Sequence, residues 1–299
     1  MSSKLQVRVI SPWFAELKTE DAVFSGGIPP EKADALLCHW APSPELFTFP
    51  RAKAWYCSEP PFNFRALQEG TWPRIRSRLA VHEFLWYDHP DPRFRVPHMT
   101  HFGELKINPN SDRIERAIAI VSNSGGPPWR RHPNHTYRNR FVTQPEVDLF
   151  GRPGWKNYRA TWFSRPGPPL NYRGALPGDW PDGTKREMMA RYKVAVCFEN
   201  MYEPYYFTEK FVEAVFAGCI PVYHAHPTVK ESVLEGAYWV DPATYGNAPE
   251  ATLKAALNTD RELVRRQNEG WLANSLGFRA TSAEAVFRRI GEILSNPVG

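Results

Sequence analysis

Carboxylate, amide, hydroxyl and ammonium groups gather in one short segment that follows an apolar run. The segment contains Glu199, Asn200, Tyr206, Thr208, Glu209 and Lys210. An ammonium binds phosphate as a compact positive charge, while carboxylates can move protons or stabilise positive charge that develops on a reacting carbon. These residue types predict a site for a phosphate-containing or nucleotide ligand.

Two apolar runs enclose this segment and indicate the elements that must position it. Val194–Phe198 and Cys219–Tyr223 are continuous and rich in β-forming residues, which is typical of strands buried on both faces of a parallel sheet. Between them we expect a helix, with Thr208 as its N-cap and Gly218 just beyond its last turn. Ligands of open parallel sheets bind beyond the carboxyl ends of the strands, where a helix N-terminus offers N–H groups and positive charge. The pattern therefore predicts a βαβ unit whose polar end binds an anion.

The same residues have an interpretation that needs no ligand. Glu209 can be a favourable first-turn carboxylate and Lys210 a solvated lysine, as in many helices. From residue types alone, both interpretations stay open.

Three strings in a fixed order carry a resemblance to a known family. They are Phe198-Glu199-Asn200, Tyr206-Phe207-Thr208-Glu209-Lys210, and Ala217-Gly218 followed by Ile220-Pro221-Val222. Together they resemble the donor-site signature of the α1,3/4-fucosyltransferases, the family 10 glycosyltransferases. The segment from Ile118 to Arg152 is similar to the opening of that family's donor domain. Tyr56-Cys57-Ser58-Glu59-Pro60 resembles the N-terminal strand and turn in which the family places its general base.

The resemblance implies an α/β fold of two Rossmann-like domains that face each other across a cleft, the GT-B type, with C-terminal helices. A cluster of helix breakers at Asn108–Asp112 marks the expected boundary. We expect an acceptor-binding domain at 1–112, a GDP-sugar donor domain at 113–280, and a C-terminal helix at 281–299 that packs back on the first domain. The implied reaction moves L-fucose from GDP-β-L-fucose to a hydroxyl of a glycan acceptor, with inversion, forming an α1,3 or α1,4 linkage.

Transfer of a sugar needs a base for the acceptor hydroxyl and positive groups for the departing diphosphate. By resemblance Glu59, in a turn held by Pro60, is the base; without the resemblance it is a surface carboxylate. Asp88 and Glu83 are weaker alternatives for the base, because nothing local positions them.

Arg138 and Lys210 are the expected ligands of the diphosphate. A guanidinium can donate two hydrogen bonds to phosphate oxygens at once, and an ammonium acts as a compact positive charge. Arg140 is an alternative to Arg138, because the preceding loop departs from the family pattern. Glu209 is expected at the sugar ring or the ribose, as the second catalytic group. The remaining expected donor-binding residues are Asn200, Tyr206, Thr208, Ser122 and Asn123. For Glu199 we expect a structural role as an acceptor of backbone N–H groups.

No cofactor is required by this scheme, and a divalent metal is not expected to be essential. No Asp-x-Asp string follows a predicted strand. Two cationic side chains and a helix N-terminus can carry the charge of a diphosphate.

Departures from the family pattern concern the donor sugar. Met201 replaces the small polar residue that usually follows the Phe-Glu-Asn string. Tyr223-His224-Ala225 stands where the family commonly has an aromatic residue followed by glycine. A transferase of the same fold that uses another GDP-sugar, and a non-catalytic sugar-binding relative, therefore stay open.

Composition restricts the classes of partner. The 299 residues suffice for two α/β domains, and the formal charge of +5 favours anionic ligands. Six arginines and one lysine lie between Arg130 and Arg159, beside the proposed donor site. No nucleic-acid motif accompanies this charge, so we expect no nucleic-acid partner. The resemblance implies a GDP-sugar donor and an oligosaccharide acceptor as partners. The oligomeric state stays open.

The four cysteines form no Cys-x-x-Cys pair, which predicts reduced structural thiols. The N-terminal segment has no apolar span long enough for a signal peptide or a transmembrane segment. We expect a cytoplasmic protein or the soluble catalytic domain of a longer one, and leave open a peripheral contact with a membrane.

Periodicity predicts the remaining elements. Strands are expected at Leu5–Ile10, Ala33–Cys38, Ala52–Tyr56 and Ile114–Val121, with a further apolar element at Leu79–Phe84. A polar loop and a helix are expected after the first of these strands. Helices are expected at Thr184–Tyr192, Pro249–Leu257, Asp260–Ser275 and Ser282–Leu294. Between Gly154 and Gly183 we expect irregular structure.

Overall fold

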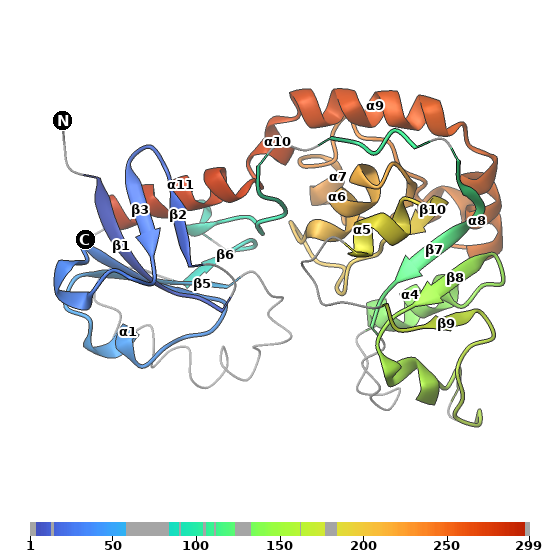
Figure 1. The fold of residues 1–299 in the computed structure, drawn as a ribbon, viewed down its shortest axis with the longest axis horizontal. Helices are drawn as coiled ribbons and strands as arrows, with labels where there is room; N and C mark the ends of the chain where they lie inside the picture. Colours follow the sequence, from blue (N-terminus) through green and yellow to red (C-terminus); the bar gives the residue numbers. More distant parts are fainter. Residues whose placement is uncertain are drawn as a thin grey trace. The chain divides into compact units, whose positions relative to one another are not determined.

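The computed structural model describes residues 4–12, 15–57, 84–89, 91–103, 106–110, 112–122, 133–161, 163–176 and 184–296. They form two compact units, each built on its own sheet (Figure 1). Unit 1 comprises residues 1–103 and 279–299, and unit 2 comprises residues 104–278. The α/β class with two Rossmann-like sheets and C-terminal helices is confirmed.

Unit 1 contains a six-stranded sheet in the order β2-β3-β1-β4-β5-β6. Its strands are β1 (Leu5–Ile10), β2 (Glu16–Lys18), β3 (Ala22–Ser25), β4 (Ala35–His39), β5 (Ala52–Cys57) and β6 (Phe84–Trp86). All neighbouring pairs are parallel except β2 and β3. Every residue of β4 is buried, which is typical of a strand covered on both faces.

Helix α11 (Ala283–Ser295) packs on the sheet of unit 1 (Figure 1). Ser282 caps it by accepting a hydrogen bond from the backbone N–H of Ala285. Its buried residues Phe287 and Ile290 join the core formed by β1, β3 and β5, and the ring of Phe287 lies edge-on to that of Phe24 at 5.0 Å. The last helix of the chain is thus part of the core of the first unit.

Unit 2 contains five parallel strands in the order β11-β10-β7-β8-β9. They are β7 (Ile114–Ile120), β8 (Val147–Phe150), β9 (Tyr172–Gly174), β10 (Tyr192–Val196) and β11 (Ile220–Val222). The chain builds β8 and β9 on one side of β7 and then β10 and β11 on the other. The strand order therefore reverses between β7 and β10, which is where open α/β sheets bind ligands.

Helices cover both faces of the sheet of unit 2. One face packs on α5 (Thr184–Met189), α6 (Glu209–Phe216), α7 (Pro227–Lys230) and the end of α9 (Arg261–Asn274); the other packs on α4 (Pro133–Val142), η5 (Pro153–Asn157) and α8 (Pro249–Asn258). The other described helices are η1 (Pro30–Lys32), α1 (Glu45–Thr48), η3 (Pro92–Phe94), η6 (Pro242–Tyr245) and α10 (Leu276–Arg279).

The predicted βαβ unit is confirmed: β10 and β11 are parallel neighbours, and α6 joins them. Gly218 ends α6 in the left-handed conformation, with φ of 72°. A Cβ atom there would lie 2.6 Å from the backbone oxygen of Asn108 and 2.7 Å from Nη2 of Arg113. Only glycine fits both the backbone angle and the space.

Three expectations about elements were wrong. The helix expected to reach Tyr192 ends at Met189, because Tyr192 already pairs with Ile114 as the first residue of β10. The Pro- and Gly-rich stretch contains an edge strand, β9, which pairs with β8. The polar segment after β1 contains strands β2 and β3 instead of a helix.

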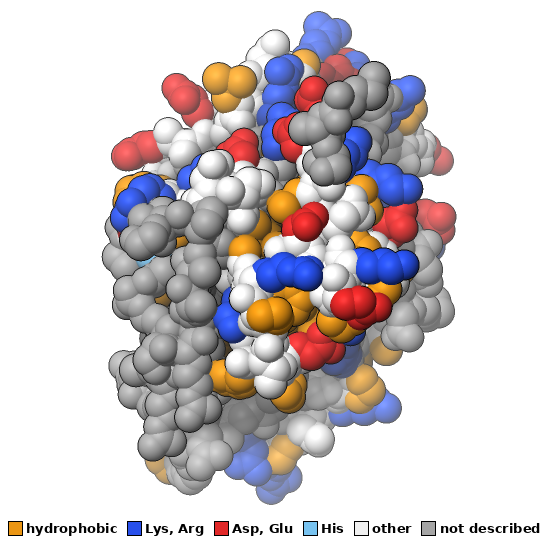
Figure 2. Space-filling view, turned by 90° about the vertical axis from the view of Figure 1, so that its left-hand side faces the viewer, with side chains coloured by type: hydrophobic (Ala, Val, Ile, Leu, Met, Phe, Trp, Pro, Cys, Tyr) orange, Lys and Arg blue, Asp and Glu red, His pale blue; other side chains and the backbone are white. Residues whose placement is uncertain are grey.

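The described surface carries charges of both signs. In Figure 2, Lys and Arg side chains lie scattered among Asp and Glu side chains and apolar groups on the face that is drawn. No helix among the described residues is long and apolar enough to cross a membrane.

Candidate active site

The carboxyl ends of β7 and β10 meet the N-terminus of α6 in unit 2. Thr208 precedes α6 with an extended backbone, as an N-cap residue does. Its side chain does not cap the helix but donates a hydrogen bond to Oε2 of Glu199 at 2.7 Å. The start of the helix is therefore tied to the turn that follows β10.

Glu199 is the centre of this arrangement and is only 2% exposed. Its Oε1 accepts hydrogen bonds from the backbone N–H of Thr208 at 2.8 Å and from the hydroxyl of Tyr223 at 2.9 Å. Its Oε2 lies 3.4 Å from Nζ of Lys210. A buried carboxylate is stable only when such donors and a cation compensate the loss of water. Glu199 therefore fixes both the helix start and Lys210.

Lys210 lies in the first turn of α6, with 17% of its side chain exposed. Its Nζ donates to Oγ1 of Thr208 at 3.0 Å and to Oε1 of Glu209 at 3.3 Å. Burial alone would lower the pKa of Lys210, but Glu209 and Glu199 outweigh burial and raise it above its ordinary value. The ammonium is thus held in place and stays charged at neutral pH.

Arg138 projects from α4 and is 3% exposed. Its Nη1 donates to Oδ1 of Asn200 at 3.0 Å, and its Nη2 donates to the backbone oxygen of Ser122 at 3.1 Å. Its Nε is buried and has no hydrogen-bond partner among the described residues. Burial lowers the pKa of Arg138 to about 10, against the opposing effects of Glu199 and Tyr206, so the guanidinium remains charged. A buried cation with one unused donor is suited to an anion.

Neighbouring side chains fix the segments that carry these groups. Asn134 of α4 donates to the backbone oxygen of Glu199 at 2.8 Å. Trp155 of η5 donates from Nε1 to the backbone oxygen of Val121 at 2.7 Å, at the end of β7. Sequence reasoning missed both residues, because an amide and an indole give no local sign of which backbone group they will bind.

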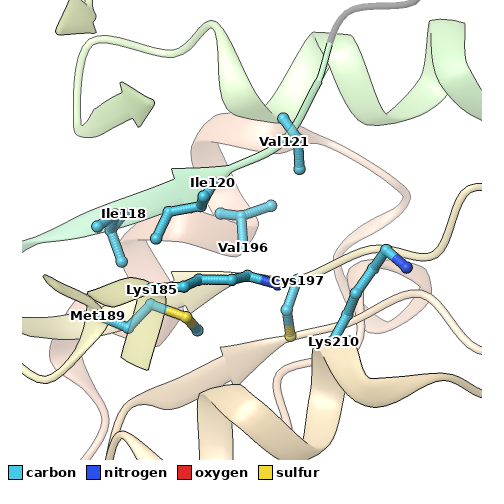
Figure 3. A pocket seen from close by; sticks show the side chains of 8 residues that line it. All are labelled: Ile118, Ile120, Val121, Lys185, Met189, Val196, Cys197 and Lys210. Atoms are coloured by element: carbon cyan, nitrogen blue, oxygen red, sulfur yellow. The ribbon is translucent and has the colours of Figure 1, made fainter. Parts of the chain in front are cut away.

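A small cavity of about 20 Å³ lies at the reversal of strand order (Figure 3). Side chains from β7, β10, α5 and α6 line it: Ile118, Ile120, Val121, Val196, Cys197, Lys185, Met189 and Lys210. Figure 3 shows the two lysines among these apolar side chains. Lys185 forms an ion pair with Glu213 of α6. Such a volume holds about one water molecule, so a sugar nucleotide must bind outside this cavity.

An aromatic cluster follows β10 and β11. The ring of His224 stacks on that of Tyr202 at 4.3 Å and 13°, and its centroid lies 4.5 Å from that of Tyr137. Burial lowers the pKa of His224, and its Nδ1 has no hydrogen-bond partner in the described part of the chain. The sequence at His224 differs from the family pattern, which marked this position as unusual. The stacking of its ring on Tyr202 was not predicted.

Most of the expected donor-binding residues that the structure describes lie in this region. Glu209 is half-buried in the first turn of α6, beside Lys210, and Ser122 is exposed at the end of β7. Tyr206 is buried, with 4% exposure. Arg140 is exposed on α4, and its Nη2 lies 3.5 Å from the backbone oxygen of Asn247.

Three of the expected residues, Glu59, Glu83 and Asn123, lie outside the described residues. Asp88 follows β6 in unit 1 and is half-buried.

Within the described ranges, no group of three or more His, Cys, Asp or Glu side chains is placed to hold a metal ion. All four cysteines are buried and unbridged, and burial raises the pKa of Cys219 to about 12, which makes it a poor nucleophile.

Comparisons with known proteins add a likeness of fold. The sequence matches no protein-family model, and no curated protein matches it. A crystal structure of α1,3-fucosyltransferase is similar over 99% of this chain and 91% of that one, with 16% identity and a TM-score of 0.54. A crystal structure of α1,3-fucosyltransferase with GDP-fucose matches over 100% of this chain and 93% of that one, with 16% identity and a TM-score of 0.52. A structure described as trehalose-6-phosphate from E. coli bound with UDP-2-fluoro glucose matches over 90% and 75%, with 10% identity and a TM-score of 0.52. The chain therefore has the fold of the α1,3-fucosyltransferases.

Proposed function

We propose that the protein is a glycosyltransferase that moves L-fucose from GDP-β-L-fucose to a hydroxyl of a glycan acceptor, forming an α1,3 or α1,4 linkage. The observation that carries the proposal is the placement of Lys210. Its charged ammonium is fixed by Glu199 at the first turn of α6, where the strand order of unit 2 reverses. This is where an open α/β sheet offers a site for a nucleotide diphosphate.

Arg138 and Lys210 stabilise the GDP leaving group in this scheme. The two cations are close enough that Arg138 opposes the rise in the pKa of Lys210. An anion between them would relieve that repulsion and use the free Nε of Arg138. Negative charge grows on the diphosphate as the bond from the sugar to phosphate breaks, so both cations bind the transition state more tightly than the substrate.

Glu209 contacts the sugar or the ribose in this proposal. In the described structure its Oε1 lies 3.3 Å from Nζ of Lys210. A carboxylate beside the diphosphate site can stabilise the positive charge that develops on the anomeric carbon. Asn200 and Tyr206 orient the donor, while Thr208 acts through the hydrogen bonds that fix Glu199 and Lys210. Ser122 and Asn123 complete the donor site.

Glu59 of unit 1 is proposed as the general base. It takes the proton of the acceptor hydroxyl while the oxygen bonds to the anomeric carbon and GDP departs from the opposite side. This single displacement inverts the anomeric centre. The charge on Arg138, Lys210 and the helix N-terminus leads us to expect transfer without an essential divalent metal.

A second candidate is the use of another GDP-sugar. It is favoured by His224, which stacks on Tyr202 and lies tilted against Tyr137. His224 belongs to the string Tyr223-His224-Ala225, which departs from the family pattern of an aromatic residue followed by glycine. A third is a sugar-binding protein without turnover.

Calorimetric titration with GDP-fucose, GDP-mannose, UDP-glucose and GDP distinguishes these candidates when followed by transfer assays on an oligosaccharide panel. Selective binding and transfer of GDP-fucose supports the first candidate, another GDP-sugar supports the second, and binding without transfer or hydrolysis supports the third. Absence of binding to every nucleotide would overturn the proposal.

A further inference from the structure

A loop between η5 and β9 of unit 2 extends away from the sheet (Figure 1). We call the described residues 158–161 and 163–170 the tip loop. A hydrogen bond of 3.1 Å from the backbone N–H of Gly167 to the oxygen of Tyr158 closes the part of the loop that carries Phe163. Leu170 follows this part, shortly before β9. The ring of Tyr158 packs at 5.3 Å on Trp155, which is fully buried. The start of the loop is therefore packed against the core of unit 2.

Two large apolar side chains of the tip loop are fully open to water. Phe163 is 94% exposed and Leu170 is 103% exposed. Among the exposed large hydrophobic residues of the described chain, the next is Leu276 in α10 at 78%. A single exposed apolar residue is ordinary, but two within one protruding loop mark a candidate surface for an apolar partner.

The turn that presents Phe163 satisfies its own polar groups. The backbone N–H of Ser164 donates to the oxygen of Thr161 at 3.2 Å, and the hydroxyls of both residues bond each other at 2.7 Å. The backbone N–H of Thr161 donates to Oγ of Ser164 at 3.2 Å. A turn with internally paired donors and acceptors loses less hydration energy when it enters a less polar medium.

The sequence on both sides of this apolar tip is cationic. Residues 149–178 include no Asp or Glu. Arg152, Lys156 and Arg165 are exposed and Arg159 is half-buried, and none of the four forms an ion pair with an acidic side chain in the described ranges. The remaining cation, Arg173, is bound to Asp148 at 2.8 Å. The loop therefore combines exposed hydrocarbon with unpaired positive charge.

This combination discriminates between kinds of partner. A nucleic acid or an acidic glycan would use the cations but would leave the aliphatic side chain of Leu170 in water. A second copy of the chain would bring the same cations together, which like-charge repulsion opposes. An anionic bilayer surface accepts both groups, because aromatic and aliphatic side chains enter the interface while Arg and Lys contact the phosphates of the head groups.

We propose that the tip loop docks the protein on an anionic membrane surface, with Phe163 and Leu170 inserted at the level of the head groups. Arg152, Lys156, Arg159 and Arg165 contact lipid phosphates around them. The contact is peripheral and reversible, since it rests on two side chains and a small basic patch. It is independent of the proposed transfer reaction.

Co-sedimentation of the full chain with vesicles tests the proposal. The vesicles are pure phosphatidylcholine or phosphatidylcholine with about 30% phosphatidylglycerol, at low salt and at about 0.5 M NaCl. We expect binding to the anionic vesicles that weakens at high salt. The double variant Phe163→Ser/Leu170→Ser should bind at least about tenfold more weakly.

Two controls keep the result specific. Leu276→Ser removes another largely exposed apolar side chain elsewhere and should bind as the wild type does. Arg159→Gln/Arg165→Gln should reduce the salt-sensitive part of the binding. Sedimentation velocity without vesicles is run on the same variants. Absence of binding to anionic vesicles, equal binding by the double serine variant, or self-association that this variant abolishes would each overturn the proposal.

Discussion

Tyr223 donates a hydrogen bond of 2.9 Å from its hydroxyl to Oε1 of Glu199, and both side chains are buried. Glu199 follows β10 and Tyr223 follows β11, so the bond joins the carboxyl ends of two neighbouring strands. The carboxylate that orients Lys210 is thus itself held by the next strand of the sheet. The pKa of Tyr223 lies well above its ordinary value, because of burial and then the charge of Glu199, so the hydroxyl remains a donor.

Tyr223→Phe should lower the free energy of unfolding by about 1 kcal/mol, because Glu199 loses one of its donors while the ring keeps its packing on Phe211. Urea unfolding measures this loss. GDP affinity should fall as well, since Glu199 is less firmly held. Tyr172→Phe is the control, because it removes a tyrosine hydrogen bond that does not involve Glu199. The hydroxyl of Tyr172, in β9, donates to the backbone oxygen of Gly151. Equal effects of both variants on GDP affinity would contradict the role given to Glu199.

Lys210→Ala should weaken binding of GDP and of GDP-sugars at least about tenfold, because a fixed ammonium at a diphosphate contributes a strong charge-assisted contact. Calorimetry measures both affinities, and thermal melting verifies that the variant is folded. Lys254→Ala, at an exposed position of α8, provides the matched control. If GDP binds Lys210→Ala as tightly as it binds the wild type, the phosphate role of Lys210 is wrong.

Glu59→Gln should keep GDP affinity within about twofold of the wild type and lose transfer by at least about a hundredfold, because an amide cannot accept the proton of the acceptor hydroxyl. Initial rates at saturating donor measure the loss. Asp88→Asn, which changes the alternative carboxylate, should transfer normally. A reversed pattern, with Asp88→Asn inactive and Glu59→Gln active, would exchange the two assignments.

Gly218→Ala should lower the free energy of unfolding by at least about 2 kcal/mol, since a Cβ atom both disfavours the left-handed backbone and meets Asn108 and Arg113. Gly246→Ala is matched to it, because Gly246 has φ of 63° and no atom within 4 Å of the added Cβ position. That variant should lose only about 1 kcal/mol. Urea unfolding of both variants separates the cost of the steric contact at position 218 from the cost of the left-handed backbone conformation. Equal losses of unfolding free energy would mean that the steric contact contributes nothing.

His39 of β4 should make stability depend on pH. Burial, followed by the charge of His98, lowers the pKa of His39 from 6.5 to about 4. Between these values the unfolded chain binds a proton that the folded chain excludes, so stability is lost as the pH falls through this window. The loss from about pH 7.5 to about pH 5 should be about 2 kcal/mol. Urea unfolding at both pH values should show a smaller difference for His39→Gln, and an unchanged difference would exclude this histidine as the source.

The elements that carry Glu199, Thr208 and Lys210 could be predicted from the sequence, because local chemistry defines them. Val194–Phe198 is apolar and β-rich, Thr208 precedes an amphipathic segment, and Gly218 allows the backbone turn that ends α6. Each of these signals acts over a few residues. They predicted the βαβ unit that the structure confirms.

Long-range partners could not be predicted in the same way. The bonds of Glu199 with Tyr223 and Asn134 join residues that are far apart in the sequence. Strands β2, β3 and β9 were missed because they are short edge or near-edge strands whose pairing, rather than their composition, makes them strands. The resemblance supplied the expectation for Arg138, and the structure places that side chain against Asn200 and Ser122.

The core of unit 1 joins the two ends of the chain. Val7 and Phe24 from its first strands pack with Phe287 and Ile290 of α11, and all of unit 2 lies between them in the sequence. During synthesis, every residue of unit 2 is added to the chain before α11 is made. One apolar face of the sheet of unit 1 therefore stays uncovered until α11 has been made. The unit that is begun first is therefore the unit that is finished last.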